Sequence, residues 1–133
     1  MGTRSLTIIN DEQGKEIVVI YQQFDGHPSG VGKTLHELLK DMKVINGISG
    51  DARMGTHANG MTCLAAQLVA ARKDEIGNVY LCPAGTRDCW EEYRYHISLS
   101  GTVLLLKVES GYDTSYEGPL AAFDPEMEGK ETA

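Results

Sequence analysis

The sequence predicts an α+β fold: a mainly antiparallel sheet of about five strands with two helices packed on one face. Runs of apolar and β-branched residues joined by short glycine turns, at 3–23 and 91–109, are typical of antiparallel hairpins. Stretches at 33–43 and 61–73 carry apolar residues with the i, i+3, i+4, i+7 spacing of amphipathic helices. The resulting order is strand–strand–helix–helix–strand–strand–strand, which favours pairing of neighbouring strands through tight turns.

The first half of the chain begins with strands at 3–10 and 15–23 around a turn at 11–14. The second of these strands is apolar on both faces, which predicts a central position in the sheet. A glycine-rich segment at 24–34 then leads into the first helix. Four glycines interrupt residues 44–60, so we expect a long irregular connection there.

The second half begins with the helix at 61–73, for which Asn59 is the expected cap. A short strand at 79–82 and a loop follow. Residues 91–100 alternate strictly between apolar and polar, as a half-buried strand does. The last strand is expected at 102–109 and an irregular cover segment at 111–123. We predict one domain over 1–123 and an acidic, disordered tail over 124–133.

Composition narrows the classes of function. The 133 residues carry a net charge of −7, which argues against general nucleic-acid binding because that requires a basic face. No apolar run approaches the roughly 18 residues of a membrane span, and we expect a cytoplasmic protein. Three cysteines without close spacing indicate free thiols. The histidine and cysteine spacings predict no metal site, and we expect no cofactor.

The segment at 24–34, FDGHPSGVGKT, has the most chemical content. A strand followed by a glycine-rich loop and a helix start can present backbone N–H groups to an anion. The segment is one residue away from the G-x-x-x-x-G-K-[ST] phosphate loop, since His27 stands where the first glycine belongs. Over these eight residues it resembles nucleotide kinases, and Lys33 and Thr34 occupy the positions that hold phosphate and magnesium.

Other observations weigh against a phosphoryl-transfer enzyme. A histidine in place of glycine strains the turn, no later strand ends in a magnesium-holding aspartate, and the strand order is not that of a parallel sheet. The segment could instead form a purely structural turn in which Ser29 caps the helix. A third alternative is a non-catalytic anion site at the helix start.

Two arginines extend this candidate site. Arg4 and Arg87 each end a Gly-Thr-Arg triplet, and a guanidinium beside a hydroxyl suits carboxylate or phosphate. Arg4 could instead pair with Asp25, and Arg87 could be a solvated charge. The predicted ligand-binding set is Arg4, Asp25, His27, Ser29, Gly30, Gly32, Lys33, Thr34 and Arg87, with no catalytic residue assigned.

The opening MGTRS and the FDGHPSGVG stretch resemble an uncharacterised family of small proteins from bacteria and their phages. Members open with G-T-R-S and carry an aromatic-D-G-aromatic-P-S-x-x-G segment. This chain departs by having His27 at the second aromatic position. The resemblance extends to Gly85-Thr86-Arg87 and to Glu92-Tyr93-x-Tyr95. It implies a viral or prophage setting, and members of such a family need not carry Lys33 and Thr34.

Together these observations predict non-enzymatic binding of a small anionic, nucleotide-like ligand, for example to sequester a signalling nucleotide. Aromatic residues gather late in the chain, where one or two could stack on a base: Tyr80, Trp90, Tyr93, Tyr95, Tyr112 and Tyr116. The alternatives are an NTPase that uses Lys33 and Thr34, and a structural or protein-interaction module. A homo-oligomer is compatible with each of them.

Overall fold

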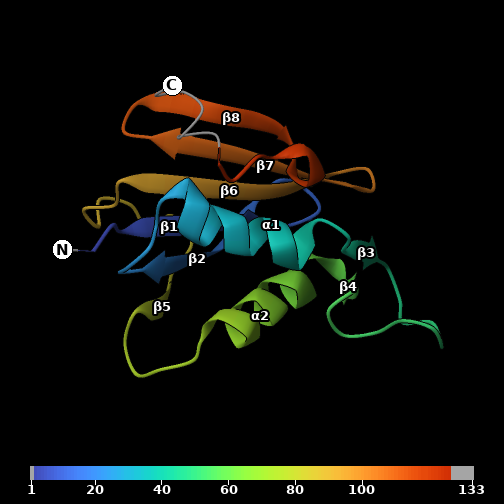
Figure 1. Ribbon diagram of the computed structural model, residues 1–133. Coiled ribbons are helices and arrows are strands. Elements are labelled where there is room, and N and C mark those ends of the chain that lie inside the picture. Colours follow the sequence, from blue (N-terminus) through green and yellow to red (C-terminus); the bar gives the residue numbers. More distant parts are fainter. Residues whose placement is uncertain (1, 127–133) are drawn as a thin grey trace.

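A six-stranded mixed sheet forms the centre of the protein, which a computed structural model describes over residues 2–126 (Figure 1). Its strand order is β5-β2-β1-β6-β7-β8. The strands are β1 (Ser5–Asn10), β2 (Glu16–Gln22), β5 (Val79–Cys82), β6 (Tyr93–Ser100), β7 (Val103–Ser110) and β8 (Asp113–Pro119). Two helices, α1 (Lys33–Leu39) and α2 (Gly60–Arg72), lie over the same face of this sheet (Figure 1).

The predicted α+β class with two helices is confirmed, but the sheet is not purely antiparallel. Strands β1 and β6 pair in parallel, from Ser5 opposite Tyr93 to Ile9 opposite Ile97. Tight turns fix the antiparallel pairs β1–β2, β6–β7 and β7–β8. The parallel pair joins the β1–β2 hairpin to the antiparallel unit β6–β7–β8. Burial of β1 in the middle of the sheet sets this contact, and no turn encodes it.

Three strands lie where the sequence predicts irregular chain. Strand β8 falls within the expected cover segment and pairs with β7 around the turn between Ser110 and Asp113. The expected irregular connection at 44–60 contains β4 (His57–Asn59), which pairs in parallel with β3 (Lys43–Ile45). A single turn of 3₁₀ helix, η2 (Leu120–Ala122), follows β8. These strands are short or polar, so their hydrophobic pattern is weak.

The main core lies between the sheet and the two helices. The predicted alternation in β6 is confirmed, since Tyr95 and Ile97 are fully buried in this core. The apolar stripe of α2 packs against them through Met61, Leu64 and Leu68. The opposite face of the sheet carries a smaller buried cluster of Leu6, Ile8 and Val19, against which Cys82 and Cys89 pack.

The start of α2 is capped differently from the prediction. Asn59 makes no capping hydrogen bond; its side-chain oxygen instead accepts from the N–H of Gly47 at 2.8 Å. The N–H of Met61 donates to Oε2 of Glu12 at 2.8 Å. The turn between β1 and β2 therefore supplies the acceptor that the helix start requires, and the expected Asn59 cap is wrong.

The segment between β5 and β6, residues 83–92, is held to the sheet by Glu16. Arg87 donates to both carboxylate oxygens of Glu16, at 2.7 and 3.0 Å, and the N–H of Gly85 also donates to Glu16. The hydrogen bond from Arg87 lowers the pKa of Glu16, although burial opposes the change. Arg87 is thus not a solvated charge; it forms an ion pair with Glu16.

Glu16→Gln is expected to lower the free energy of unfolding by about 1 kcal/mol at pH 7. The pKa of Glu16 is lower in the folded protein than in the unfolded chain. Its contribution to the free energy of unfolding is therefore fully present above the unfolded pKa and is lost as pH falls through the folded pKa. Urea titrations at pH 7, 5, 4 and 3 should therefore show a shallower acid loss in the variant. Exposed Glu117 offers the control Glu117→Gln; equal acid profiles for E16Q and wild type would contradict the prediction.

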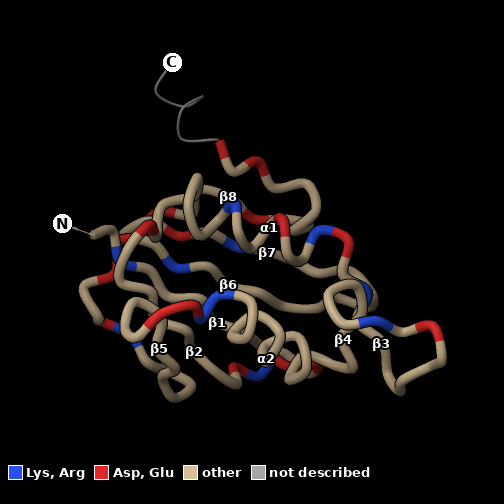
Figure 2. Tube along the Cα trace, turned by 60° about the horizontal axis from the view of Figure 1, so that its bottom comes forward, with Lys and Arg blue, Asp and Glu red and all other residues tan. Residues whose placement is uncertain are grey.

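Lysine and arginine positions are interspersed with aspartate and glutamate positions along the trace (Figure 2). All three cysteines are free, as predicted. None of the helices within residues 2–126 combines the length and apolar character needed to cross a bilayer. The acidic tail predicted at 124–133 lies mostly outside the described residues.

Candidate functional site

The glycine-rich segment is a helical turn and not an open loop. Residues Pro28–Gly32 form a π-helix, η1, that continues directly into α1. The N–H of Gly30 donates to the carbonyl of His27, and that of Val31 to the carbonyl of Asp25, both at 2.8 Å. The N–H of Gly26 donates to Thr3 at 2.8 Å. These amides are therefore paired with the protein's own carbonyls and do not point toward a ligand.

The glycines of this segment permit close packing of the backbone. A Cβ atom built on Gly30 would lie 2.2 Å from the carbonyl oxygen of Asp25. One built on Gly26 would lie 2.7 Å from the carbonyl oxygen of Thr3. Gly32 is less restricted, with the ring of Phe123 3.1 Å from its built Cβ. Gly26 and Gly30 thus serve backbone contacts inside the protein.

The side chains of the segment are likewise directed to local contacts. His27 Nδ1 lies 2.9 Å from Ser29 Oγ in a hydrogen bond, and Ser29 does not cap the helix. The hydroxyl of Thr34 donates to the carbonyl of Gly30 at 3.2 Å. Asp25 has a left-handed backbone (φ 61°), and its carboxylate is 4.0 Å from His27 Nε2. This arrangement differs from a phosphate loop, in which the hydroxyl and amides are free to bind ligand.

The three cations of the predicted ligand-binding set have different surroundings. Lys33 is exposed on the first turn of α1. Arg4 is half-buried, and no ion pair with Asp25 is formed within the described residues. Arg87 is bound to Glu16, and its pKa is raised by that hydrogen bond despite burial, with smaller contributions from Glu91 and Glu109. The predicted contacts of Lys33 and Arg4 with an anion stay predictions.

A buried arginine at the end of α2 is the most unusual charged group of the described chain. Arg72 is only 7% exposed. It donates to Thr7 Oγ1 at 3.0 Å and to Gln22 Oε1 at 2.6 Å, while its Nε has no acceptor. Burial lowers its pKa to about 10, opposed by electrostatic contact with Tyr95. None of its described neighbours is a carboxylate that balances this charge.

A second unpaired polar atom lies close by on the same face of the sheet. Among the described residues, Arg72 Nε and Ser5 Oγ are the buried side-chain atoms that lack a hydrogen-bond partner. Ser5 is two residues before Thr7 in β1, so both side chains point toward the helices, about 7 Å apart. The cluster is covered by Gly26, whose carbonyl accepts from Tyr95 Oη at 2.7 Å. It therefore lies under the start of η1.

Arg72 is not among the residues predicted from the sequence, although its position in the helix carries a signal. It follows Leu64 and Leu68 at successive four-residue steps, so it falls on the buried stripe of α2. An arginine in the last turn of a helix also has a simpler interpretation as a structural residue, because the helix dipole favours a cation there. That dipole balances part of the charge but leaves Nε without an acceptor.

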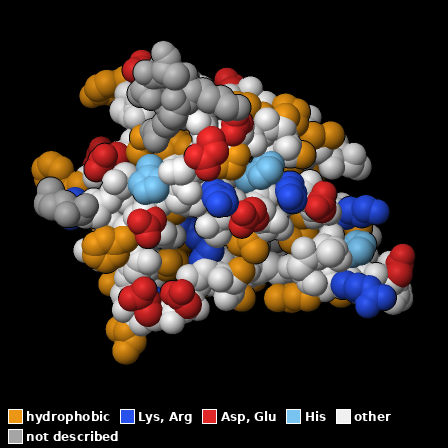
Figure 3. Space-filling view, viewed as in Figure 1, with side chains coloured by type: hydrophobic (Ala, Val, Ile, Leu, Met, Phe, Trp, Pro, Cys, Tyr) orange, Lys and Arg blue, Asp and Glu red, His pale blue; other side chains and the backbone are white. Residues whose placement is uncertain are grey.

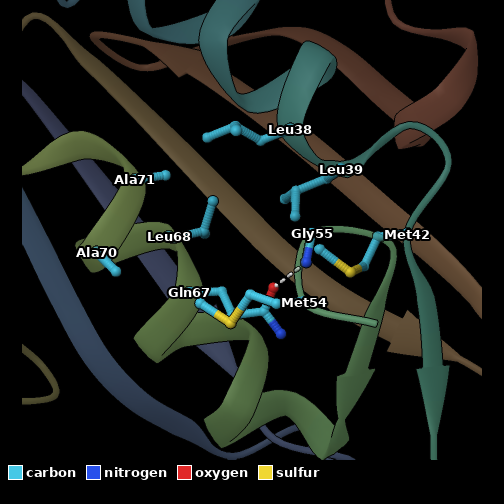
Figure 4. A pocket seen from close by; sticks show the side chains of 9 residues that line it. All are labelled: Leu38, Leu39, Met42, Met54, Gly55, Gln67, Leu68, Ala70 and Ala71. Atoms are coloured by element: carbon cyan, nitrogen blue, oxygen red, sulfur yellow. Dashed lines mark hydrogen bonds between the residues drawn. The ribbon is translucent and has the colours of Figure 1, made fainter. Parts of the chain in front are cut away.

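An apolar cavity of about 280 Å³ separates α1 from α2 (Figure 4). Hydrophobic side chains reach the surface between the two helices (Figure 3). Its polar lining group, Gln67, accepts from the N–H of Gly55 at 3.0 Å and donates to His57 O at 2.8 Å. The other lining side chains are Leu38, Leu39, Met42, Met54, Leu68, Ala70 and Ala71. The cavity offers no free donor to an anion.

Comparison with family models, curated proteins and solved structures finds no match to this chain. The described residues contain no group of three or more His, Cys, Asp or Glu that could hold a metal ion.

Proposed function

We propose that this protein is a non-catalytic binder of a small anion, and that Arg72 is the group that holds the negative charge. The observation that carries the proposal is the buried guanidinium of Arg72, which has a free Nε and no balancing carboxylate among the described residues. The neighbouring hydroxyl of Ser5 is also without a partner. An oxyanion at this place would accept hydrogen bonds from the Nε–H of Arg72 and from the hydroxyl of Ser5.

The energetics favour such a ligand. A pKa lowered from the ordinary arginine value to about 10 corresponds to a cost of about 3 kcal/mol for keeping the guanidinium charged in the folded protein. A carboxylate or phosphate oxygen bound to Nε offsets this cost, because charge-assisted hydrogen bonds strengthen in a medium of low polarity. The chemical class of the ligand is therefore an anion with a compact charged end, of which a nucleotide phosphate is one example.

This proposal keeps the predicted class of ligand but assigns binding of its negative charge to Arg72 in place of the glycine-rich segment. In the glycine-rich segment, the amides of Gly30 and Val31 are paired and the hydroxyl of Thr34 is bonded within the helix. The NTPase alternative relies on those groups, so the geometry favours binding without turnover. Sequestration of a signalling nucleotide stays a prediction based on the resemblance to phage proteins.

The test is calorimetric titration with inorganic phosphate, a dicarboxylate, and mono-, di- and cyclic nucleotides. We expect at least one of these anions to bind, and Arg72→Gln to weaken that binding at least about tenfold. Lys33→Ala should leave the affinity within about twofold of wild type, whereas a phosphate loop would depend on that lysine. Binding lost in K33A and kept in R72Q would contradict the proposal.

Exposed Arg53 provides the matched control, since Arg53→Gln removes the same charge from the surface. It should leave anion affinity unchanged at moderate salt. If none of the tested anions gives heats larger than those of buffer dilution, the proposed function is wrong. Arg72 would then serve only to hydrogen-bond α2 to the sheet through Thr7 and Gln22.

A further inference from the structure

A second pocket lies at one end of the sheet, on the face opposite the helices. Its volume is about 460 Å³, and it is lined by Asp88, Trp90, Glu91, Arg94, Gly111 and Tyr112. The lining comes from the 83–92 segment, from Arg94 of β6 and from the turn between β7 and β8. The rings of Trp90 and Tyr112 are exposed, Trp90 to 84%. Two large aromatic side chains beside one pocket, with little burial of their own, are typical of a surface that is completed by a ligand or partner.

The backbone places the tryptophan there at a conformational cost. Asp88 and Trp90 both have left-handed backbones, with φ of 60° and 62°. Such conformations cost on the order of 1 kcal/mol for residues other than glycine and occur preferentially at binding sites. The N–H of Cys89 donates to Glu91 Oε1 at 2.7 Å, and that of Glu92 to Arg4 O at 2.9 Å. These bonds hold the turn from which the exposed Trp90 ring projects.

The pocket is negatively charged, because its arginine is already neutralised. Arg94 donates to Glu109 at 3.1 Å, to Glu91 at 3.2 Å and to the carbonyl of Gly111 at 2.8 Å. The exposed carboxylate of Asp88 makes no ion pair within residues 2–126. Burial raises the pKa of nearby Cys89, and the charges of Glu91 and Asp88 raise it further. An anionic ligand would meet repulsion here, whereas a cation would not.

We propose that this pocket docks a basic side chain, arginine or lysine, of a partner protein. The cationic group lies against the rings of Trp90 and Tyr112 and faces the carboxylate of Asp88. Cations bind favourably over aromatic faces, and tryptophan most strongly. Tryptophan and tyrosine are also the residues most often dominant in protein–protein contacts. The net charge of −7 on the chain favours the approach of a basic partner.

Trp90 is the sole tryptophan of the chain, so its fluorescence reports on this pocket directly. The experiment titrates the full chain with a neutral-capped heptapeptide of alternating glycine and arginine. The comparison peptides carry norleucine or glutamate in place of arginine. We expect a saturable change in Trp90 emission with the arginine peptide alone, and labelled-peptide anisotropy should give the same affinity. Raised salt should weaken binding.

Two variants test the assignment. Asp88→Asn and Tyr112→Ala should each weaken binding of the arginine peptide about fivefold or more. The matched controls are Asp41→Asn and Tyr80→Ala, an exposed acid and an exposed aromatic outside the pocket, which should bind as wild type does. The proposal is overturned if the emission does not saturate, if D88N and Y112A bind as wild type does, or if the glutamate peptide binds as well as the arginine peptide.

Discussion

Replacing Gly30 by alanine is expected to destabilise the protein by about 2–4 kcal/mol. The added Cβ would lie 2.2 Å from the carbonyl oxygen of Asp25, a backbone atom that cannot rotate away. That carbonyl also accepts the N–H of Val31, and Asp25 itself has a left-handed backbone. Moving it aside would break the hydrogen bond that starts the helical turn. Urea unfolding followed by circular dichroism measures the loss.

Gly50 is the matched control, because no atom of the described residues lies within 4 Å of its built Cβ and its φ is not positive. Gly50→Ala should change the free energy of unfolding by less than about 0.5 kcal/mol. A phosphate loop would give a different pattern, in which Gly30→Ala removes ligand binding and leaves stability intact. That pattern would show that the segment opens to bind a ligand.

Arg72→Met is expected to raise the stability of the unliganded protein by about 1–3 kcal/mol while removing its response to anions. Methionine fills a similar volume without a charge, and replacing buried charges by apolar side chains is often stabilising. The variant gives up hydrogen bonds to Thr7 and Gln22, of which Gln22 is half-buried and can bond to water. Thermal unfolding with and without phosphate or nucleotide measures both effects.

Arg53→Met tests whether loss of any positive charge has the same result. It should leave both the unfolding temperature and its dependence on anions as in wild type. If Arg72→Met lowers the free energy of unfolding by more than about 1 kcal/mol, the hydrogen bonds of Arg72 stabilise the fold by more than its buried charge destabilises it. The proposed anion site would then lose its energetic support.

The parts of the fold predicted from sequence are those that depend on local pattern. The stripe of α2, the alternation in β6 and the β1–β2 hairpin follow from residue periodicity and turn chemistry. The parallel contact of β1 with β6 depends on burial across residues far apart in the chain. No local pattern distinguishes it from antiparallel pairing, which explains the departure.

The candidate site was harder to predict for a related reason. The sequence of residues 24–34 matches a loop that exposes amides, but the same glycines also allow a tight turn with buried amides. Which of the two forms depends on contacts with Thr3 and Tyr95, which lie elsewhere in the chain. Arg72 is unusual because none of its neighbours within residues 2–126 is a carboxylate, and the sequence alone does not show which residues surround a side chain. The aromatic pocket likewise joins two distant loops.

The central place of β1 has a consequence during synthesis. Ser5 lies opposite Tyr93, 88 positions later, so the ribosome completes β1 long before its parallel neighbour exists. At about 5–20 residues per second, the β1 edge of the nascent hairpin stays unpaired for roughly 4–18 s. An open edge of this kind can recruit strands from other chains. Slower translation or a lower growth temperature would change that interval, and with it the fraction of newly made chains that aggregates.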